Sequence, residues 1–272
     1  MEYKLIADSG STKTDWVLLK NGEFYRRYST QGINPVLLGA EKITDILKNE
    51  LLTQISGVSI DRIEFYGAGC RGVQCDVVAQ ALQTVLGTKQ IVVESDMLGA
   101  ARALCGTSAG IVCILGTGSN SCLYDGCQIV QNVSPLGFIL GDEGSGAVLG
   151  KRLIGDVFKR QLPVSVVDMF LNEYKFGIDD IIQKVYREPM PNRFLASFAP
   201  FLYQHRDCAE VHALLVDEFS RFFVRNVANY QRKELPVHFV GSIAYYFKDE
   251  LKDAAALCGF DLGKIKKAPL DD

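Results

Sequence analysis

Two short loops have the residue types that bind phosphate groups. One covers residues 8–14 and the other residues 116–120, and both consist mainly of glycine, serine and threonine. Such loops bring backbone N–H groups and hydroxyls close to anionic oxygens without collisions from large side chains. In the first loop, Asp8 could hold Mg²⁺ directly or through water, and three further side chains could reach phosphate oxygens: Ser11, Thr12 and Lys13.

Two acidic positions could act on a hydroxyl group. Asp96 follows the apolar residues 91–93 and precedes a helical pattern, so it would lie at the carboxyl end of a strand, where α/β proteins usually bind ligands. The alternative is an N-cap or first-turn acid. Asp142 and Glu143 lie between glycines in residues 141–146, as needed where the backbone approaches a polyhydroxyl ligand, although a tight solvated turn has the same composition.

Other motifs suggest competing chemistries. Residues 67–72 form a G-x-G-x-x-G run after a predicted strand at 63–66, which is the best case for an NAD(P)-dependent oxidoreductase. Glu94 lies 27 residues beyond Gly67, farther than the roughly 20 expected of a ribose-binding acid, and a lone fingerprint has many false positives. Gly150 and Lys151 do not complete a P-loop, and the cysteine pairs 70/75 and 122/127 fit metal-site spacings poorly.

An internal repeat positions the two phosphate loops. Residues 4–7 and 15–19 are predicted strands around the first loop, and Asn21-Gly22 then forms a hairpin turn to a third strand at 24–28. The same unit returns as strands 111–115, 121–124 and 128–131, with a turn at Asp125-Gly126. An ordinary turn would explain either loop alone, but two at matching places favour phosphate binding, with the active site in a cleft between two similar halves.

The remaining pattern alternates helix and strand, which predicts the α/β class. Helices are expected at 73–86 and 96–104, and strands at 90–93 and 237–240. Residues 149–230 are mainly helical, with a break at 189–191. A small-residue link at 106–110 predicts a domain boundary, so that the domains would be residues 1–108 and 109–272.

Composition restricts the class of partner. The chain has 272 residues, of which 48% are hydrophobic, and a net charge of −3 without a Lys/Arg-rich run, which argues against a nucleic-acid binder. No apolar run approaches the ~20 residues needed to span a bilayer, and the first residues lack a signal-peptide pattern, so we expect a cytoplasmic protein that does not bind membranes. The eight cysteines are expected to be reduced thiols.

These motifs together resemble the N-acetylglucosamine kinase and BadF/BadG/BcrA/BcrD-type ATPase family, within the actin, Hsp70 and sugar-kinase superfamily. The resemblance covers essentially the whole chain and depends on residues 8–14, 116–120 and 141–145. It implies two ribonuclease-H-like (actin-like ATPase) domains, the second with a helical insertion. It also implies an ATP- and Mg²⁺-dependent kinase acting on the 6-hydroxyl of an amino sugar, most of all N-acetylglucosamine.

The loops and the resemblance together predict the site residues. Asp96 resembles the general base, and Asp8 is the expected metal ligand. The predicted ATP contacts are Ser9, Gly10, Ser11, Thr12, Lys13, Gly116, Thr117, Gly118, Gly241 and Ser242. The predicted sugar contacts are Asn34, Asp96, Ser119, Asn120, Leu136, Gly137 and Asp142.

Two departures from the family leave alternatives open. Leu136-Gly137 replaces a Trp-Gly pair of vertebrate-like members, so the identity of the amino sugar stays open. Activator ATPases of the family, which have no sugar acceptor, carry a cluster-binding cysteine before the second loop, whereas Leu115 immediately precedes Gly116 here. The activator therefore ranks below the kinase. The oligomeric state also stays open, with a homodimer as one option.

Overall fold

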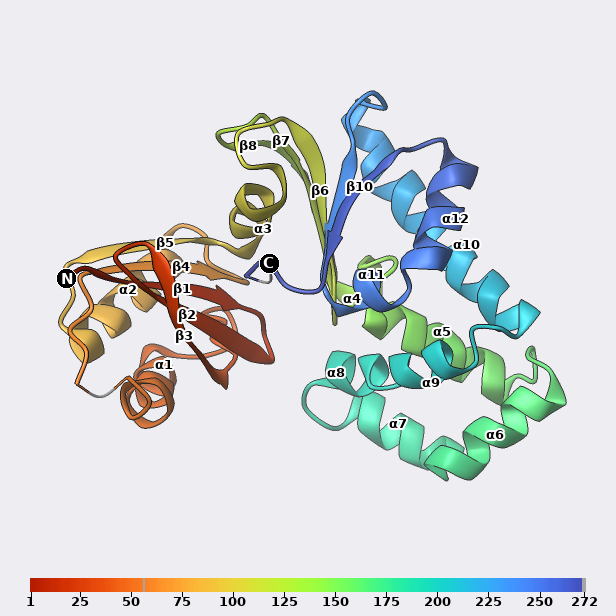
Figure 1. Ribbon diagram of the computed structural model, residues 1–272. Helices are drawn as coiled ribbons and strands as arrows, with labels where there is room; N and C mark the ends of the chain where they lie inside the picture. Colours follow the sequence, from red (N-terminus) through yellow and green to blue (C-terminus); the bar gives the residue numbers. More distant parts are fainter. Residues whose placement is uncertain (56, 271–272) are drawn as a thin grey trace. The chain divides into compact units, whose positions relative to one another are not determined.

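The computed structural model describes residues 1–55 and 57–270. The chain divides into two compact units, which are described separately: unit 1 is Met1–Ala103 with the chain from Pro269 onward, and unit 2 is Leu104–Ala268. Each unit is built around a five-stranded sheet with helices (Figure 1). The α/β class and the two ribonuclease-H-like halves are confirmed. That residues 1–108 and 109–272 are separate domains remains a prediction.

The sheet of unit 1 has the strand order β3-β2-β1-β4-β5. Antiparallel pairing joins β1 (Tyr3–Ser9) to β2 (Lys13–Lys20), and β2 to β3 (Glu23–Gln31). Parallel pairing joins β1 to β4 (Arg62–Gly67), and β4 to β5 (Gln90–Ser95). The three parallel strands therefore end at one edge, where the first phosphate loop lies.

The sheet of unit 2 repeats this order as β8-β7-β6-β9-β10. The antiparallel part is β6 (Gly110–Leu115), β7 (Ser119–Tyr124) and β8 (Ile129–Val133). The parallel part adds β9 (Val237–Val240) and β10 (Leu262–Lys266) to β6. Both units also have a register shift near the hairpin turn, at Leu18/Leu19 and at Leu123/Tyr124. The repeat seen in the sequence is thus a repeat of fold.

The first hairpin turn follows its sequence closely. Asn21 and Gly22 have φ angles of 51° and 86°, the two positive values that a type I′ turn requires. In the second hairpin, Oδ1 of Asp125 instead accepts hydrogen bonds from the N–H groups of Cys127 and Gln128, both at 2.8 Å. Both predicted turns therefore form, by different local hydrogen bonding.

The helices that supply the core of unit 1 are α1 (Ala40–Ile46), which continues as the π-helix η1 (Leu47–Leu52), and α2 (Val73–Leu86). Helix α3 (Asp96–Cys105) follows β5, and its last two residues belong to unit 2. Alternate residues of β1 point into this core, because Leu5, Ala7 and Ser9 are all fully buried. Lys4, Ile6 and Asp8 are half-buried on the opposite face.

Unit 2 contains most of the helices. They are α4 (Gly137–Leu140), α5 (Gly146–Phe158), α6 (Val164–Tyr174), α7 (Ile178–Tyr186), α8 (Pro191–Ala196), α9 (Ala199–Gln204), α10 (Ala209–Arg225), the 3₁₀ helix η2 (Val227–Tyr230), α11 (Ser242–Tyr246) and α12 (Lys248–Cys258). Met190 has a φ of 60° and Pro191 begins α8, so the predicted helical break occurs where the prolines lie. Phe170 of α6 packs against Phe201 of α9 and against Phe198, which lies between α8 and α9.

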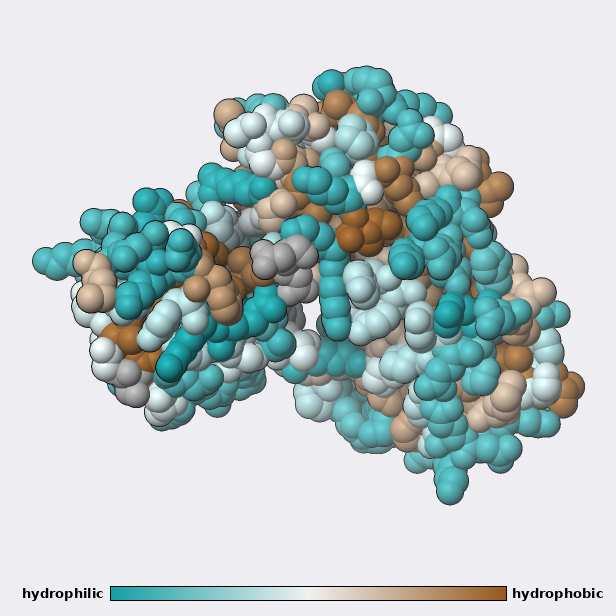
Figure 2. All heavy atoms as spheres, in the orientation of Figure 1, coloured by the Kyte–Doolittle hydropathy of each residue, from teal (hydrophilic) through white to brown (hydrophobic). Residues whose placement is uncertain are grey.

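The surface mixes polar and apolar residues. On the side shown in Figure 2, hydrophilic residues surround the hydrophobic ones over both units. Within residues 1–55 and 57–270, no helix is long and apolar enough to cross a membrane. All eight cysteines are free thiols, of which Cys70, Cys113 and Cys122 are buried.

Candidate active site

The parallel strands of unit 1 bring three sequence motifs to one edge. The strand register pairs Ser9 with Gly67, and Gly67 with Ser95. The first phosphate loop, the G-x-G-x-x-G turn and Asp96 therefore begin side by side at the carboxyl ends of β1, β4 and β5. Ligands of open α/β sheets usually bind at this edge.

Asp8 lies on the half-buried face of β1, away from the core. It lines a cavity of about 250 Å³ together with Ile6, Tyr66, Gly99 and Arg102, all in unit 1. Tyr66 fixes one wall, because its hydroxyl accepts a hydrogen bond of 3.0 Å from Nη1 of Arg102. Asp8 thus presents one carboxylate next to open space at the predicted metal position.

Ser9 has a structural role that its sequence motif did not reveal. Its buried hydroxyl shares a 2.6 Å hydrogen bond with Thr14, donates to the carbonyl of Ile33 at 3.0 Å and accepts from the N–H of Ile33 at 3.0 Å. These bonds use the full hydrogen-bonding capacity of one hydroxyl. A phosphate could therefore reach the backbone of Ser9 but not its hydroxyl, and the predicted contact between Ser9 and ATP stays a prediction.

The tip of the first loop is tied to the predicted sugar residue. Gly10 donates its N–H to the carbonyl of Lys13 at 3.0 Å, which closes the loop. Ser11 accepts a 3.1 Å hydrogen bond from Nδ2 of Asn34, so these two predicted site residues lie together. Thr12 is exposed at the tip, whereas Lys13 pairs with Asp15 at 2.7 Å.

The G-x-G-x-x-G turn serves packing within the protein. A Cβ on Gly67 would lie 2.8 Å from Sγ of Cys70, and a Cβ on Gly69 would collide with the side chain of Asn34. The space that these glycines leave is thus occupied by the chain's own side chains, whereas a dinucleotide fold uses it for pyrophosphate. The oxidoreductase interpretation loses its structural basis.

Asp96 begins helix α3 and is half-buried. Ser95 is the N-cap, because its hydroxyl accepts a 3.2 Å hydrogen bond from the N–H of Leu98. Oδ1 of Asp96 accepts one from the N–H of Met97 at 2.8 Å. Burial raises the pKa of Asp96, while the Met97 N–H and the positive charge of Arg71 oppose that rise. Asp96 is therefore a first-turn acid of α3, and its carboxylate is also more basic than that of an exposed aspartate.

In unit 2 the second phosphate loop lies beside the predicted adenosine loop. Strands β6 and β9 are parallel neighbours, with Ile114 paired to Val240, so they end together at Gly116 and Gly241. Gly241 has a φ of +120°, and any Cβ there would collide with the carbonyl of Leu115. Only glycine fits this close approach, and Ser242 then begins α11.

Helix α5 holds the second loop from behind. The N–H groups of Gly146 and Ala147 donate to the carbonyls of Gly116 and Thr117, at 2.8 and 3.1 Å. Ser145 caps this helix by accepting from the N–H of Val148 at 3.2 Å. The first N–H groups of α5 are therefore used to fix the loop.

Asp142 meets the second loop directly. The N–H groups of Ser119 and Gly137 point to its carboxylate and favour its charged form, and its backbone has a left-handed φ of 55°. Burial raises the pKa of Asp142 to about 6, and the negative charge of Glu143 adds to this rise, whereas the two N–H groups and Lys151 oppose it. The structure thus brings Asp142 together with the predicted site residues Gly118, Ser119 and Gly137.

Asn120 and Leu136 complete the predicted sugar residues of unit 2. Oδ1 of Asn120 accepts from the N–H of Ser121 and from Nδ2 of Asn132, both at 2.9 Å, so Nδ2 is the atom that Asn120 can offer to a hydroxyl. Leu136 has a φ of 61° and a side chain that is 62% exposed. It precedes Gly137 at the start of α4, whose Ile139 and Leu140 are also exposed.

Some residues near these groups were not predicted from the sequence. Lys151 donates from Nζ to the carbonyl of Phe138 at 2.8 Å and places its charge near Asp142. Arg225 forms an ion pair with Glu143. No local pattern marks either residue, because each meets its partner only after the chain has folded.

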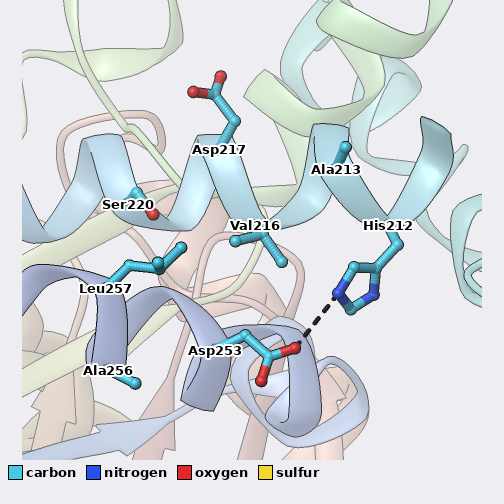
Figure 3. A pocket seen from close by; sticks show the side chains of 8 residues that line it. All are labelled: His212, Ala213, Val216, Asp217, Ser220, Asp253, Ala256 and Leu257. Atoms are coloured by element: carbon cyan, nitrogen blue, oxygen red, sulfur yellow. Dashed lines mark ion pairs between the residues drawn. The ribbon is translucent and has the colours of Figure 1, made fainter. Parts of the chain in front are cut away.

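A surface groove lies elsewhere in unit 2. It has a volume of about 730 Å³ between α10 and α12, and Figure 3 shows His212 and Asp253 paired across it. Nε2 of His212 lies 3.2 Å from Oδ2 of Asp253. Among its lining residues are Val216, Ala256 and Leu257, none of which belongs to the motifs above.

The fold agrees with that of solved structures. The chain is 49% identical to a Porphyromonas gingivalis protein whose crystal structure is described as that of a "Putative N-acetylglucosamine Kinase". The two match with a TM-score of 0.96 over 99% of this chain and 96% of that chain. The chain belongs to the N-acetylglucosamine kinase family. This match confirms the family that the sequence motifs predict.

More distant members and relatives of the N-acetylglucosamine kinase family support the fold. A similarly described protein from Chromobacterium violaceum is 18% identical, with a TM-score of 0.78 over 99% of this chain and 96% of that chain. The glucosamine kinase GspK of Vibrio cholerae is 28% identical over 167 residues, which are 59% of this chain and 56% of GspK. The match thus spans little more than half of that curated relative. No family model matches the chain.

Proposed function

We propose that this chain is an ATP-dependent kinase that phosphorylates the 6-hydroxyl of an amino sugar, with N-acetylglucosamine as the first acceptor. The observation that carries the proposal is the 49% identity to the Porphyromonas gingivalis protein over almost the whole of both chains. The geometry within each unit supports it, because each unit has a small-residue loop and a half-buried carboxylate at the same edge of its sheet.

The two loops are proposed to bind the phosphates of ATP. A Cβ on Gly116 would meet nothing within 4 Å, so a phosphate can approach the backbone there. The hydroxyls of Thr12 and Thr117 lie at the loop tips and can donate to phosphate oxygens, while Gly241 and Ser242 lie beside the second loop for the adenosine. Such contacts act by positioning and charge stabilisation, which dominate phosphoryl transfer.

Asp8 fits a magnesium site of the kind found in kinases. Within residues 1–55 and 57–270, no three His, Cys, Asp or Glu side chains cluster closely enough to hold a metal ion. Magnesium usually keeps several waters and is held by one or two carboxylates plus substrate phosphates, which matches the single carboxylate of Asp8. When bound, Mg²⁺ would neutralise phosphate charge.

Asp96 is proposed as the general base that accepts the proton of the sugar hydroxyl. Burial makes its carboxylate more basic, while the Met97 N–H and the charge of Arg71 favour the ionised form that a base requires. General-base assistance is typically worth about 10² to 10⁴ in rate. The proton would move to the carboxylate of Asp96 as the hydroxyl oxygen attacks.

The sugar contacts are proposed for each unit by itself. Asn34 in unit 1 is held by Ser11, and in unit 2 the carboxylate of Asp142 and the amide of Asn120 can bond sugar hydroxyls. The N–H group of Ser119 orients the carboxylate of Asp142 toward the sugar. Leu136 and Gly137 form the exposed start of α4.

The test is a panel of acceptors assayed for ADP release by the purified chain with ATP and Mg²⁺. The panel contains N-acetylglucosamine, glucosamine, N-acetylmuramic acid, an anhydro-sugar and a reaction without acceptor, and NMR locates the phosphate on the product. We expect release that depends on an amino sugar and a phosphate on its 6-oxygen. Equal ADP release without acceptor would instead indicate an ATPase or activator, and NADH binding without ATP binding would indicate the oxidoreductase.

A further inference from the structure

Glu143 follows Asp142 directly but has entirely different partners. Its side chain is buried, with a residue exposure of 8%, and Oε1 forms an ion pair with Nε of Arg225, the last residue of α10. Oε2 lies 3.4 Å from Nδ2 of Asn226, which follows that helix. One carboxylate of the pair thus faces the second phosphate loop, and the other is bound to the end of α10.

Gly144 fastens the same turn to the middle of α10. Its N–H donates to Oε1 of Glu218 at 3.4 Å, and a Cβ there would lie 3.2 Å from Phe222. Glu218 is only 2% exposed and also pairs with Arg152 of α5 at 3.4 Å. The turn after Asp142 is therefore held by buried or half-buried polar contacts over two turns of the helix.

Asp142 needs such support because its own backbone is strained. A left-handed conformation at a residue with a side chain costs roughly 1–2 kcal/mol and persists only where surrounding contacts enforce it. On one side its carboxylate packs against Gly118, where a Cβ would lie 2.9 Å from Oδ2, and the N–H groups of Ser119 and Gly137 favour its charged form. The contacts of Glu143 fix the backbone on the other side.

We infer that Glu143 is a positioning residue, which through its ion pair with Arg225 holds Asp142 where that carboxylate binds the acceptor sugar. This inference rests on the proposed function. It separates the roles of the acidic pair, since Asp142 would contact the sugar and Glu143 would act only through Asp142. It also gives α10, which contains none of the predicted site residues, a part in sugar binding.

The charges around Asp142 and Glu143 predict that two substitutions shift the pKa of Asp142 in opposite directions. Asp142 faces Lys151 of α5, Glu143 and the two N–H groups, while Glu143 faces Arg225 and Asn226. Glu218 lies nearby with its own partners, Arg152 and Arg221. The negative charge of Glu143 raises the pKa of Asp142, and Arg225 offsets that charge. Glu143→Gln should therefore lower the pKa of Asp142, and Arg225→Gln should raise it.

The experiment measures both binding and titration in these variants. The Asp142 carboxyl would be followed by ¹³C NMR without ligands, with its resonance assigned from Asp142→Asn. Steady-state kinetics would give separate KM values for sugar and ATP. We expect both variants to raise the sugar KM by roughly 10- to 100-fold, because misplacement of a group by about 1 Å can cost about that much, while the ATP KM changes little.

Two further variants distinguish positioning from simple destabilisation. Arg225→Lys retains the charge and should recover part of the sugar affinity. Arg232→Gln breaks an exposed ion pair with Glu234 in unit 2, outside residues 141–146, and should leave both KM values and the titration unchanged. The inference is overturned if the two test variants shift the Asp142 titration in the same direction or not at all, or if sugar and ATP KM values rise together.

Failure of the proposed function would look different. If the wild-type chain releases no ADP in response to any sugar, the kinase assignment fails. The NMR titration still decides whether Glu143 and Arg225 control Asp142, because it needs neither substrate.

Discussion

Gly118 and Asp142 lie in direct contact, so that a Cβ on Gly118 would be 2.9 Å from Oδ2 of Asp142. That carboxylate cannot easily move aside, because the N–H groups of Ser119 and Gly137 hold it. The second phosphate loop and the acidic turn therefore determine each other's position. This contact leads to the first prediction.

Gly118→Ala should displace the Asp142 carboxylate and reduce kcat/KM for the sugar by roughly 10- to 100-fold, as expected for a positioning error of about 1 Å. Steady-state kinetics with varied sugar would measure it. Gly155→Ala is the matched control, since its Cβ would meet nothing within 4 Å in α5. It should leave kinetics unchanged and add about 0.5–1 kcal/mol of stability. Equal kcat/KM values for the sugar in the two variants would show that the contact between Gly118 and Asp142 does not position the carboxylate for catalysis.

Asp96→Asn should lower kcat by about 10² to 10⁴, because it removes the proposed general base while keeping the size of the side chain. The ATP KM should change little, since Asp96 is not a predicted phosphate contact. Asp76→Asn, at an exposed first-turn acid of α2, is the control and should behave as wild type. Turnover within a few-fold of wild type in Asp96→Asn would remove this residue from the role.

The raised pKa of Asp142 predicts that this group costs stability at neutral pH. Its folded-state pKa of about 6 exceeds the ordinary value of 3.8, so the folded chain binds more protons between these values and loses stability as pH rises through them. Solvent screening reduces the effect, because the carboxylate is partly exposed. Above about pH 6.5, the free energy of unfolding of Asp142→Asn should therefore exceed that of wild type by about 1 kcal/mol, and the two values should converge below about pH 4.

Urea denaturation at several pH values would measure this difference. In Glu143→Gln the pH range over which stability falls should move to lower pH, because the pKa of Asp142 falls, although the lost ion pair with Arg225 lowers stability at neutral pH. A difference between Asp142→Asn and wild type that does not vary with pH would show that Asp142 titrates normally.

Ser9→Ala should reduce the free energy of unfolding by about 1–3 kcal/mol, because it leaves buried partners in Thr14 and Ile33 unsatisfied. The ATP KM should change much less than in Thr12→Ala. Ser108→Ala, at an exposed serine, should change neither property. A large rise in the ATP KM of Ser9→Ala with unchanged stability would instead indicate that the Ser9 hydroxyl contacts a phosphate.

Leu136→Gly should relieve the left-handed strain at Leu136 and raise the free energy of unfolding by up to about 1 kcal/mol. If Leu136 contacts the sugar, the same substitution should raise the sugar KM. Gln231→Gly is the control, because Gln231 has a φ of 54° at the end of η2 and is not a predicted site residue. It should gain similar stability with unchanged kinetics, and parallel kinetics in both variants would argue against a sugar contact at Leu136.

Much of the fold could be predicted because its signals are local. The Asn21-Gly22 turn and the prolines around Met190 act within a few residues, and each produced the expected element. Helix α2 (Val73–Leu86) and strand β9 (Val237–Val240) match their predicted bounds. Strand β10 was missed, because three lysines in its vicinity and its short length hide the apolar pattern.

In the candidate site, too, some features could be predicted from the sequence and others could not. Composition and repetition were enough to identify the two small-residue loops and the carboxylates at strand ends, because the types and order of residues carry that information. The partners were not predictable, since Ser9 meets Ile33 across 24 residues and Glu143 meets Arg225 across 82. Pairings of this kind depend on how strands and helices pack. Packing alone thus decided that the Ser9 hydroxyl is structural, and that Asp142 faces the loop while Glu143 is bound to α10.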